Sequence, residues 1–206
     1  MNLSKIFLAV VLACLTLAGC GQPASQEDKA ALPVQFVNER YNLHVTDLTQ
    51  IDPAYLFIYA NNLFNKGEKD EALFWFYVAQ YRALIVRVME NEKSLLSPQL
   101  YQQLAQDAGT PVIGKMVVLG DGLNRGHLYN YIHSGLGIDI NGYAGSNMDN
   151  WITQLEKVMA FEEAHPFDPY QAVPAKQLNK EKLPEAQRRA KGLAEMIAFL
   201  KAIKPN

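Results

Sequence analysis

Apolar and polar positions alternate along most of the chain with the spacing of an α-helix. The apolar residues that follow Pro53 fall on one helical face. They are Leu56, Tyr59, Ala60, Leu63 and Phe64. Asp52 is suited to cap this helix, a proline is favourable at its first position, and Gly67 is suited to end it. The pattern therefore predicts a helix between Asp52 and Gly67.

A second helix is predicted directly after Gly67, at the centre of the fold. Asp70 and Glu71 fall in its first turn, where carboxylates are favourable at the positive end of the helix dipole. From Ala72 to Ala79, eight apolar residues follow one another without interruption. A helix that is apolar on every side must be covered on every side, so we expect other helices to surround this one.

Three further helices are expected from caps, prolines and apolar periodicity. They run from Ser97 to about Ala108, from Ser146 or Asn147 to His165, and from Pro184 to Ala202. The stretch from Gly109 to Gly145 holds nine of the 13 glycines, and we expect short helices joined by tight turns there. The predicted fold is mainly α, a single irregular helical bundle over residues 34 to 206.

The first twenty residues carry an export signal. Lys5 precedes the apolar stretch Ile6 to Leu17, which is too short to span a membrane. The sequence Leu17-Ala18-Gly19-Cys20 that ends this stretch resembles the lipobox of bacterial lipoproteins. The resemblance implies that residues 1 to 19 are removed as a signal peptide and that the Cys20 thiol is lipidated. The alternative is an ordinary signal peptide followed by a chance cysteine.

The residues around Cys20 indicate where the domain would lie. Residues 20 to 33 are small and polar after the cysteine, as in a flexible tether. Gly21, with no aspartate at this position, resembles the sorting signal that sends lipoproteins to the outer membrane of Gram-negative bacteria. Each acyl methylene that is buried in the bilayer contributes about 0.8 kcal/mol to membrane binding, so acyl chains on Cys20 would hold the protein at the membrane. We therefore expect a lipid anchor in the outer membrane and a domain that faces the periplasm.

The first two predicted helices resemble a single tetratricopeptide (TPR) or Sel1-type repeat. The resemblance rests on the spacing of small and aromatic residues at Ala60, Gly67, Ala72, Phe76 and Ala79. No second copy follows at the period of about 34 residues that such repeats have, and one repeat cannot bury its face alone. The alternative, a helical hairpin within a bundle of its own kind, is the simpler interpretation.

Neither composition nor motifs point to catalysis or to nucleic-acid binding. The histidines include no zinc motif, and no Gly-x-Ser-x-Gly sequence occurs. The net charge of −2 argues against nucleic acid as the main partner, because phosphate binding needs a basic surface. We therefore expect no metal, no cofactor and no catalytic residues. A hydrolase with an unrecognised site remains the enzymatic alternative.

Two segments are candidates for contact with a partner. Gly120 to Gly126 is glycine-rich but lacks the lysine and the hydroxyl residue of a phosphate loop, so we interpret it as a recognition loop. The candidate partner-binding residues are Asp121, Asn124, Arg125 and His127. Residues 176 to 206 carry 8 basic and 3 acidic side chains. This basic segment could contact anionic lipid, an acidic partner or the acidic remainder of the protein itself, the last being the simplest role.

A lipid-anchored helical domain without a catalytic set is most often a binding protein. The chain looks like lipoprotein immunity proteins, which neutralise antibacterial effectors delivered to the periplasm. That resemblance implies a non-enzymatic module that binds a protein partner, in addition to the membrane contact through the anchor. The alternative is a structural or assembly factor of the bacterial cell envelope.

Overall fold

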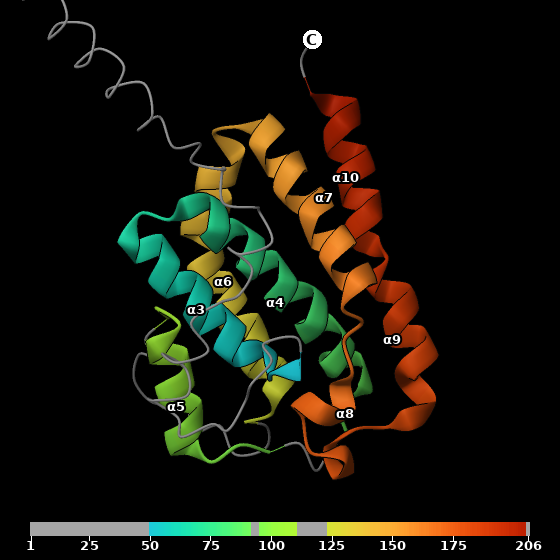
Figure 1. Ribbon diagram of the computed structural model, residues 1–206. Helices are drawn as coiled ribbons and strands as arrows, with labels where there is room; N and C mark the ends of the chain where they lie inside the picture. Colours follow the sequence, from blue (N-terminus) through green and yellow to red (C-terminus); the bar gives the residue numbers. More distant parts are fainter. Residues whose placement is uncertain (1–49, 92–94, 111–122, 205–206) are drawn as a thin grey trace, which may run out of the picture. The chain divides into compact units, whose positions relative to one another are not determined.

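The computed structural model describes residues 50–91, 95–110 and 123–204, and these are mostly helical (Figure 1). The elements are α3 (Pro53–Lys66), α4 (Lys69–Met89), α5 (Pro98–Asp107), α6 (Arg125–Gly145), α7 (Met148–Ala164), α8 (Pro169–Ala172), η3 (Ala175–Gln177), η4 (Lys180–Lys182), α9 (Leu183–Ala190) and α10 (Gly192–Ile203). The described residues contain isolated β-bridges but no strand. The prediction of a mainly α fold is confirmed. The predicted signal peptide, lipidated cysteine and tether lie outside the described residues.

α3 and α4 form a helical hairpin whose ends are fixed by local signals. Asp52 Oδ1 accepts a hydrogen bond from the backbone N–H of Ala54 at 3.0 Å, and Pro53 is the first helical residue. Gly67 ends α3 with a φ of 87°, a left-handed conformation that glycine adopts without strain. Its N–H donates to the carbonyl of Phe64 at 3.0 Å. The predicted ends of α3 are confirmed, whereas the TPR-like character of the hairpin stays a prediction.

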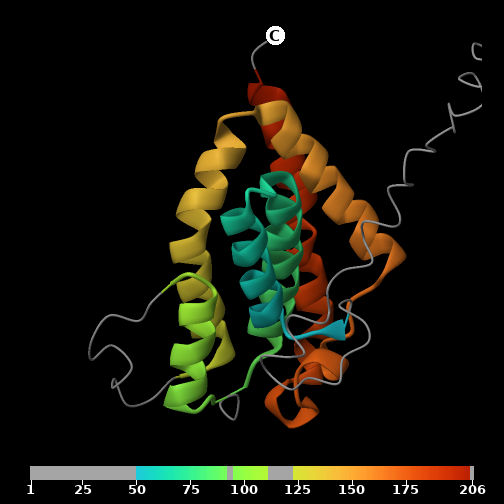
Figure 2. The ribbon, with the colours of Figure 1, turned by 60° about the vertical axis from the view of Figure 1, so that its left-hand side comes forward.

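α4 lies at the centre of the bundle and packs against α3, α6, α7 and α9 (Figure 2). Leu73, Phe76 and Val78 on this helix are fully buried. The ring of Phe76 meets that of Phe57 on α3 edge to face, with 5.6 Å between the ring centroids. The central position predicted for the run Ala72 to Ala79 is therefore confirmed.

Among the described helices, one, α4, has the length and the apolar composition that a membrane-spanning helix needs. In this fold, however, 67% of its apolar stretch is buried by the rest of the domain. Packing in the core is therefore sufficient to explain why α4 is so hydrophobic.

α6 corrects the prediction of short helices between Gly109 and Gly145. Residues 111–122 lie outside the described residues, but Arg125–Gly145 is one continuous helix of 21 residues. Gly135 and Gly137 within it permit close packing and do not form turns. A Cβ at Gly135 would lie 2.3 Å from Thr110 Oγ1, and one at Gly137 would lie 3.3 Å from the ring of Phe76. These two glycines therefore let α6 approach its neighbours closely.

The C-terminal segment forms two helices where one was predicted, because α9 ends at Ala190 and α10 begins at Gly192. α10 packs along α7. Lys201 Nζ lies 2.6 Å from Glu156 Oε1, and Lys204 forms a second ion pair with Asp149. These contacts confirm that the basic segment docks against the protein's own acidic surface.

Candidate functional site

The predicted recognition residues Asn124, Arg125 and His127 lie at the start of α6. Asn124 caps the helix, because its Oδ1 accepts a hydrogen bond from the His127 N–H at 2.8 Å. The side chain of His127 is exposed. Asp121 lies outside the described residues. The structure therefore places Asn124 and His127 at the N-terminal end of α6 and not on a glycine-rich loop.

Arg125 requires a larger correction, because it is not displayed to a partner. Its side chain is only 12% exposed, and its Nε donates to Asp52 Oδ2 at 2.7 Å. A second nitrogen of the guanidinium donates to Gln177 Oε1. Asp52 also accepts a hydrogen bond from the hydroxyl of Tyr129 at 2.7 Å. Arg125 therefore joins the start of α3 to the start of α6 as a structural residue.

The carboxylate of Glu90, at the end of α4, binds the first turn of α6. Its two oxygens accept hydrogen bonds from the backbone N–H groups of Arg125, at 2.8 Å, and Gly126, at 3.0 Å. A helix leaves such N–H groups unsatisfied at its start and carries partial positive charge there, so a carboxylate is favourable at this position. Glu90 thereby fixes the end of α4 beside the start of α6.

The segment around η3 and η4 is attached to the same end of α4 by hydrogen bonds. The N–H of Asn179 donates to the carbonyl of Met89 at 2.7 Å, and the N–H of Asn91 donates to that of Gln177 at 3.1 Å. The side-chain amide of Asn91 donates to the carbonyl of Lys176 at 3.0 Å. Three parts of the chain that are distant in sequence are thus held together at one place.

Between these three parts lies an open groove of about 680 Å³, which we call the basic groove. Its lining residues are Arg87, Glu90, Asn91, Asn124, Lys176, Asn179 and Lys182. All of them are polar or charged, and three are cations. Pockets for small organic ligands are mostly apolar and enclosed, whereas this groove is polar and open. Its cations and amide groups suit an anionic group.

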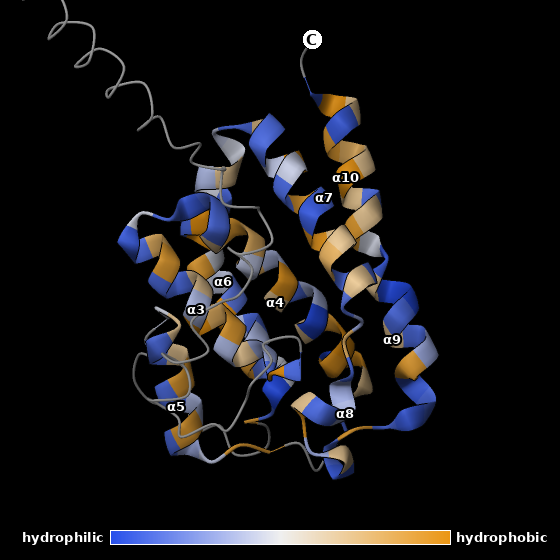
Figure 3. Cartoon of the chain, viewed as in Figure 1, coloured by the Kyte–Doolittle hydropathy of each residue, from blue (hydrophilic) through white to orange (hydrophobic). Residues whose placement is uncertain are grey.

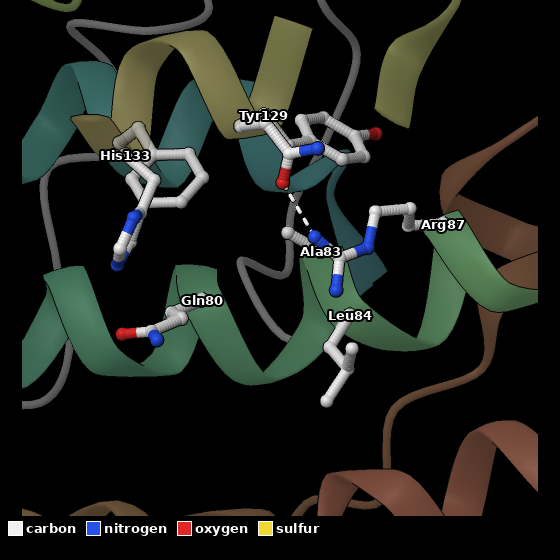
Figure 4. A pocket seen from close by; sticks show the side chains of 8 residues that line it. Gln80, Ala83, Leu84, Arg87, Tyr129 and His133 are labelled. Carbon is white, nitrogen blue, oxygen red and sulfur yellow. Dashed lines mark hydrogen bonds between the residues drawn. The ribbon is translucent and has the colours of Figure 1, made fainter. Parts of the chain in front are cut away.

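A second, smaller hollow of about 220 Å³ lies between α4 and α6, and we call it the α4–α6 pocket (Figure 4). Its lining residues are Phe57, Gln80, Ala83, Leu84, Arg87, Tyr129, Asn130 and His133. Figure 4 shows the ring of His133 directed from α6 toward α4, where the side chain of Gln80 lies. Arg87 Nη1 donates a hydrogen bond to Asn130 Oδ1 at one end of it.

His133 is the histidine that lines the α4–α6 pocket. Its ring stacks on Phe76, with 5.5 Å between centroids and 20° between planes. Burial lowers the pKa of His133, and the nearby Arg87 guanidinium lowers it further. The imidazole is therefore neutral at pH 7. Gln80 Oε1 is buried without a hydrogen-bond partner in the described part of the chain. The pocket thus offers a neutral imidazole and an amide oxygen to a small polar molecule.

Sequence reasoning missed both hollows, apart from Asn124 in the basic groove. The sequence shows Lys176 and Lys182 only as part of a basic segment, because no local signal indicates that η3 and η4 return to the end of α4. His133 belongs to no motif in the sequence. The spacing of His133 and Gly137, four residues apart on one side of α6 and both against Phe76, could have indicated its position.

The described residues contain no group of three or more His, Cys, Asp or Glu side chains that could hold a metal ion. No protein-family model, no curated protein and no solved structure matches the chain.

Proposed function

We propose that the chain is a lipoprotein, anchored in the outer membrane through Cys20, that acts as a non-enzymatic protein-binding module in the periplasm. The observation that supports this function best is the basic groove. It is built from three separate segments, and backbone hydrogen bonds hold its walls in place. Because its walls are already held in place, such a groove can bind a partner without a large loss of conformational entropy.

The charges of the basic groove suggest the chemistry of the partner. Arg87, Lys176 and Lys182 contribute positive charge, and the carboxylate of Glu90 is already bound by the first turn of α6. The groove therefore presents cations and amide groups to solvent. Such a surface favours an acidic segment of a partner, both by attraction over a distance and by direct hydrogen bonds.

Two kinds of partner are compatible with this function. An immunity lipoprotein would bind an antibacterial effector, and an envelope assembly factor would bind a component of the outer-membrane or cell-wall machinery. Both need a protein-binding surface on a tethered domain, and the identity of the captured protein distinguishes them.

Charge reversal in the basic groove tests the proposal. A photo-crosslinking amino acid is placed at Asn179 in the full-length protein, and crosslinked partners are identified after irradiation of intact cells. Lys176→Glu with Lys182→Glu should reduce crosslinking at least about tenfold, because juxtaposed like charges cost several kcal/mol. The matched control is Lys66→Glu with Lys157→Glu, which makes the same charge change at exposed positions outside the groove. Equal losses in the two double variants would contradict the proposal.

An enzymatic activity would also overturn it. Purified full-length protein is incubated with lipid, peptide and glycan substrates, and the proposal expects no turnover. Hydrolysis that is lost on His133→Ala or His127→Ala would make the α4–α6 pocket or the start of α6 an active site.

A further inference from the structure

α10 leaves one side exposed that is unusually apolar for a protein surface. Phe199 is 60% exposed and Ile203 is 50% exposed, although each is a large hydrophobic side chain. They are four residues apart and therefore lie on the same side of the helix. Ala198 and Ala202 beside them are also exposed. In Figure 3, α10 is mostly coloured as hydrophobic, whereas α9 is mostly hydrophilic.

The opposite side of α10 already has its partner. Leu200 is buried, and Lys201 and Lys204 form ion pairs with acidic residues of α7. Self-docking of the C-terminal segment therefore uses only one side of this helix. Contiguous apolar surface on a folded domain is typical of a contact with another molecule or with a membrane.

Basic side chains continue this exposed surface along α9. Arg188 is exposed on α9. Lys191 lies at the junction of the two helices and is exposed. Neither side chain forms an ion pair in the described part of the chain, whereas neighbouring Arg189 pairs with Glu185. Glu195, an exposed acidic residue in the first turn of α10, lies four residues before Phe199 and therefore on the same side of that helix. We call the surface formed by Arg188, Lys191, Phe199 and Ile203 the α9–α10 stripe.

We propose that the α9–α10 stripe docks the domain onto an anionic lipid surface, with Phe199 and Ile203 in the interface and Arg188 and Lys191 on the headgroups. Positive charge beside exposed apolar side chains is the combination by which surface helices bind anionic bilayers. The cations Arg188 and Lys191 outnumber the exposed carboxylate of Glu195, so the surface keeps a net positive charge beside its apolar side chains. The α9–α10 stripe is separate from the basic groove, so docking and partner binding use different residues.

This inference rests on the lipid anchor of the proposed function. A chain from Cys20 to Gln50 can extend over at most about 100 Å, so the domain stays within reach of the bilayer in which Cys20 is anchored. Anchoring through Cys20 would make docking intramolecular, which raises the effective concentration of the bilayer at the α9–α10 stripe. A small apolar contact assisted by a few charges is then sufficient.

Tryptophan quenching tests the contact directly. The lipidated full-length protein is reconstituted in vesicles of phosphatidylethanolamine and phosphatidylglycerol whose acyl chains carry bromine, which quenches tryptophan on contact. The variant is Phe199→Trp. The fluorescence of Trp75 and Trp151 is measured in the wild-type protein and subtracted from that of the variant. The matched control is Ile138→Trp, at a side chain that is 74% exposed on α6. We expect a blue shift and quenching at position 199 and neither at position 138.

The charge requirement is tested in the same background. Arg188→Gln with Lys191→Gln should shift the equilibrium toward the undocked state by roughly 30-fold, because each basic residue near an anionic surface contributes about 1 kcal/mol. Quenching at position 199 should fall accordingly, whereas Lys66→Gln with Lys157→Gln should leave it unchanged.

Three results would overturn docking onto lipid. The first is equal quenching at positions 199 and 138, and the second is full quenching that persists in Arg188→Gln with Lys191→Gln. The third is a blue shift at position 199 without quenching, accompanied by crosslinks between copies of the chain, which would assign the α9–α10 stripe to self-association. Failure of the anchor is distinguishable from each, because it appears as loss of acyl label from the protein.

Discussion

Arg82 of α4 and Glu162 of α7 form an ion pair inside the protein, with 2.6 Å between Nε and Oε1 and side chains that are 0% and 3% exposed. The guanidinium also lies over the rings of Phe161 and Phe167, at 5.4 and 5.1 Å from their centroids. Burial raises the pKa of Glu162, and the charge of Arg82 opposes that rise. The pair joins the central helix to α7 at the cost of two buried charges.

Removal of one partner should therefore destabilise the protein strongly. Arg82→Met leaves Glu162 buried without its counter-ion, and we expect a loss of about 3–5 kcal/mol in the free energy of unfolding. Arg82→Met with Glu162→Leu should lose less, because no charge remains buried. The control is Arg189→Met, which breaks an exposed ion pair with Glu185 and should cost less than about 1 kcal/mol. Chemical denaturation measures all three, and equal losses for Arg82→Met and Arg189→Met would contradict the prediction.

Phe76→Ala should destabilise the protein by about 3–5 kcal/mol, because the ring is fully buried between α3 and α6 and its removal leaves a cavity. Phe199→Ala is the matched control. Its ring is 60% exposed, and we expect a change within about 0.5 kcal/mol. Denaturant titration measures the loss of unfolding free energy for both variants. A loss below about 1 kcal/mol for Phe76→Ala would contradict the prediction and show that the helices around α4 collapse into the vacated space.

The environment of His133 predicts a specific dependence of stability on pH. Its pKa in the folded protein lies below the usual 6.5, so the unfolded chain takes up this proton first as the pH falls. The contribution of His133 is therefore complete above pH 6.5 and decreases as the pH falls through the interval just below it. In His133→Gln this component is absent. On acidification across that interval the wild-type protein should lose unfolding free energy relative to His133→Gln, and parallel curves for the two proteins would refute the assignment.

Cys20→Ala should abolish membrane attachment, because it removes the thiol that would carry the lipid and with it the processing signal. Labelled palmitate and membrane fractionation measure the outcome. Cys14→Ala is the control, since this cysteine lies within the predicted signal peptide and its loss should leave labelling intact. Label that persists in Cys20→Ala would refute the lipoprotein assignment.

The helix starts could be predicted because their signals are local. Asp52, Ser97 and Asn147 each accept a hydrogen bond from an N–H group two or three residues later, so sequence and structure contain the same information there. α6 could not be predicted in the same way. Whether Gly135 makes a turn or permits close packing depends on Thr110, which lies far from it in the sequence.

The candidate sites were harder to predict than the fold for the same reason. Arg125 is a charged residue in a glycine-rich stretch, which in the sequence favours an exposed loop. Only its contact with Asp52, 73 residues earlier, shows that it is structural. The basic groove likewise depends on η3 and η4 meeting the end of α4, which no local pattern indicates. Charge did contain usable information, since the ion pairs of Lys201 and Lys204 follow from the excess of basic residues in the last segment.

For a chain that is exported as we propose, the position of Arg82 within α4 would affect its passage through a secretion channel. An exported chain enters such a channel unfolded, and α4 is apolar enough there to resemble a stop-transfer segment. An arginine near the middle of a helix opposes its lateral exit into the bilayer by about 2.5–3.5 kcal/mol, which offsets several leucine or phenylalanine residues. Glu162, which later neutralises this charge, is 80 residues further along the chain. Arg82 would therefore keep α4 in the aqueous path until α7 has followed it across.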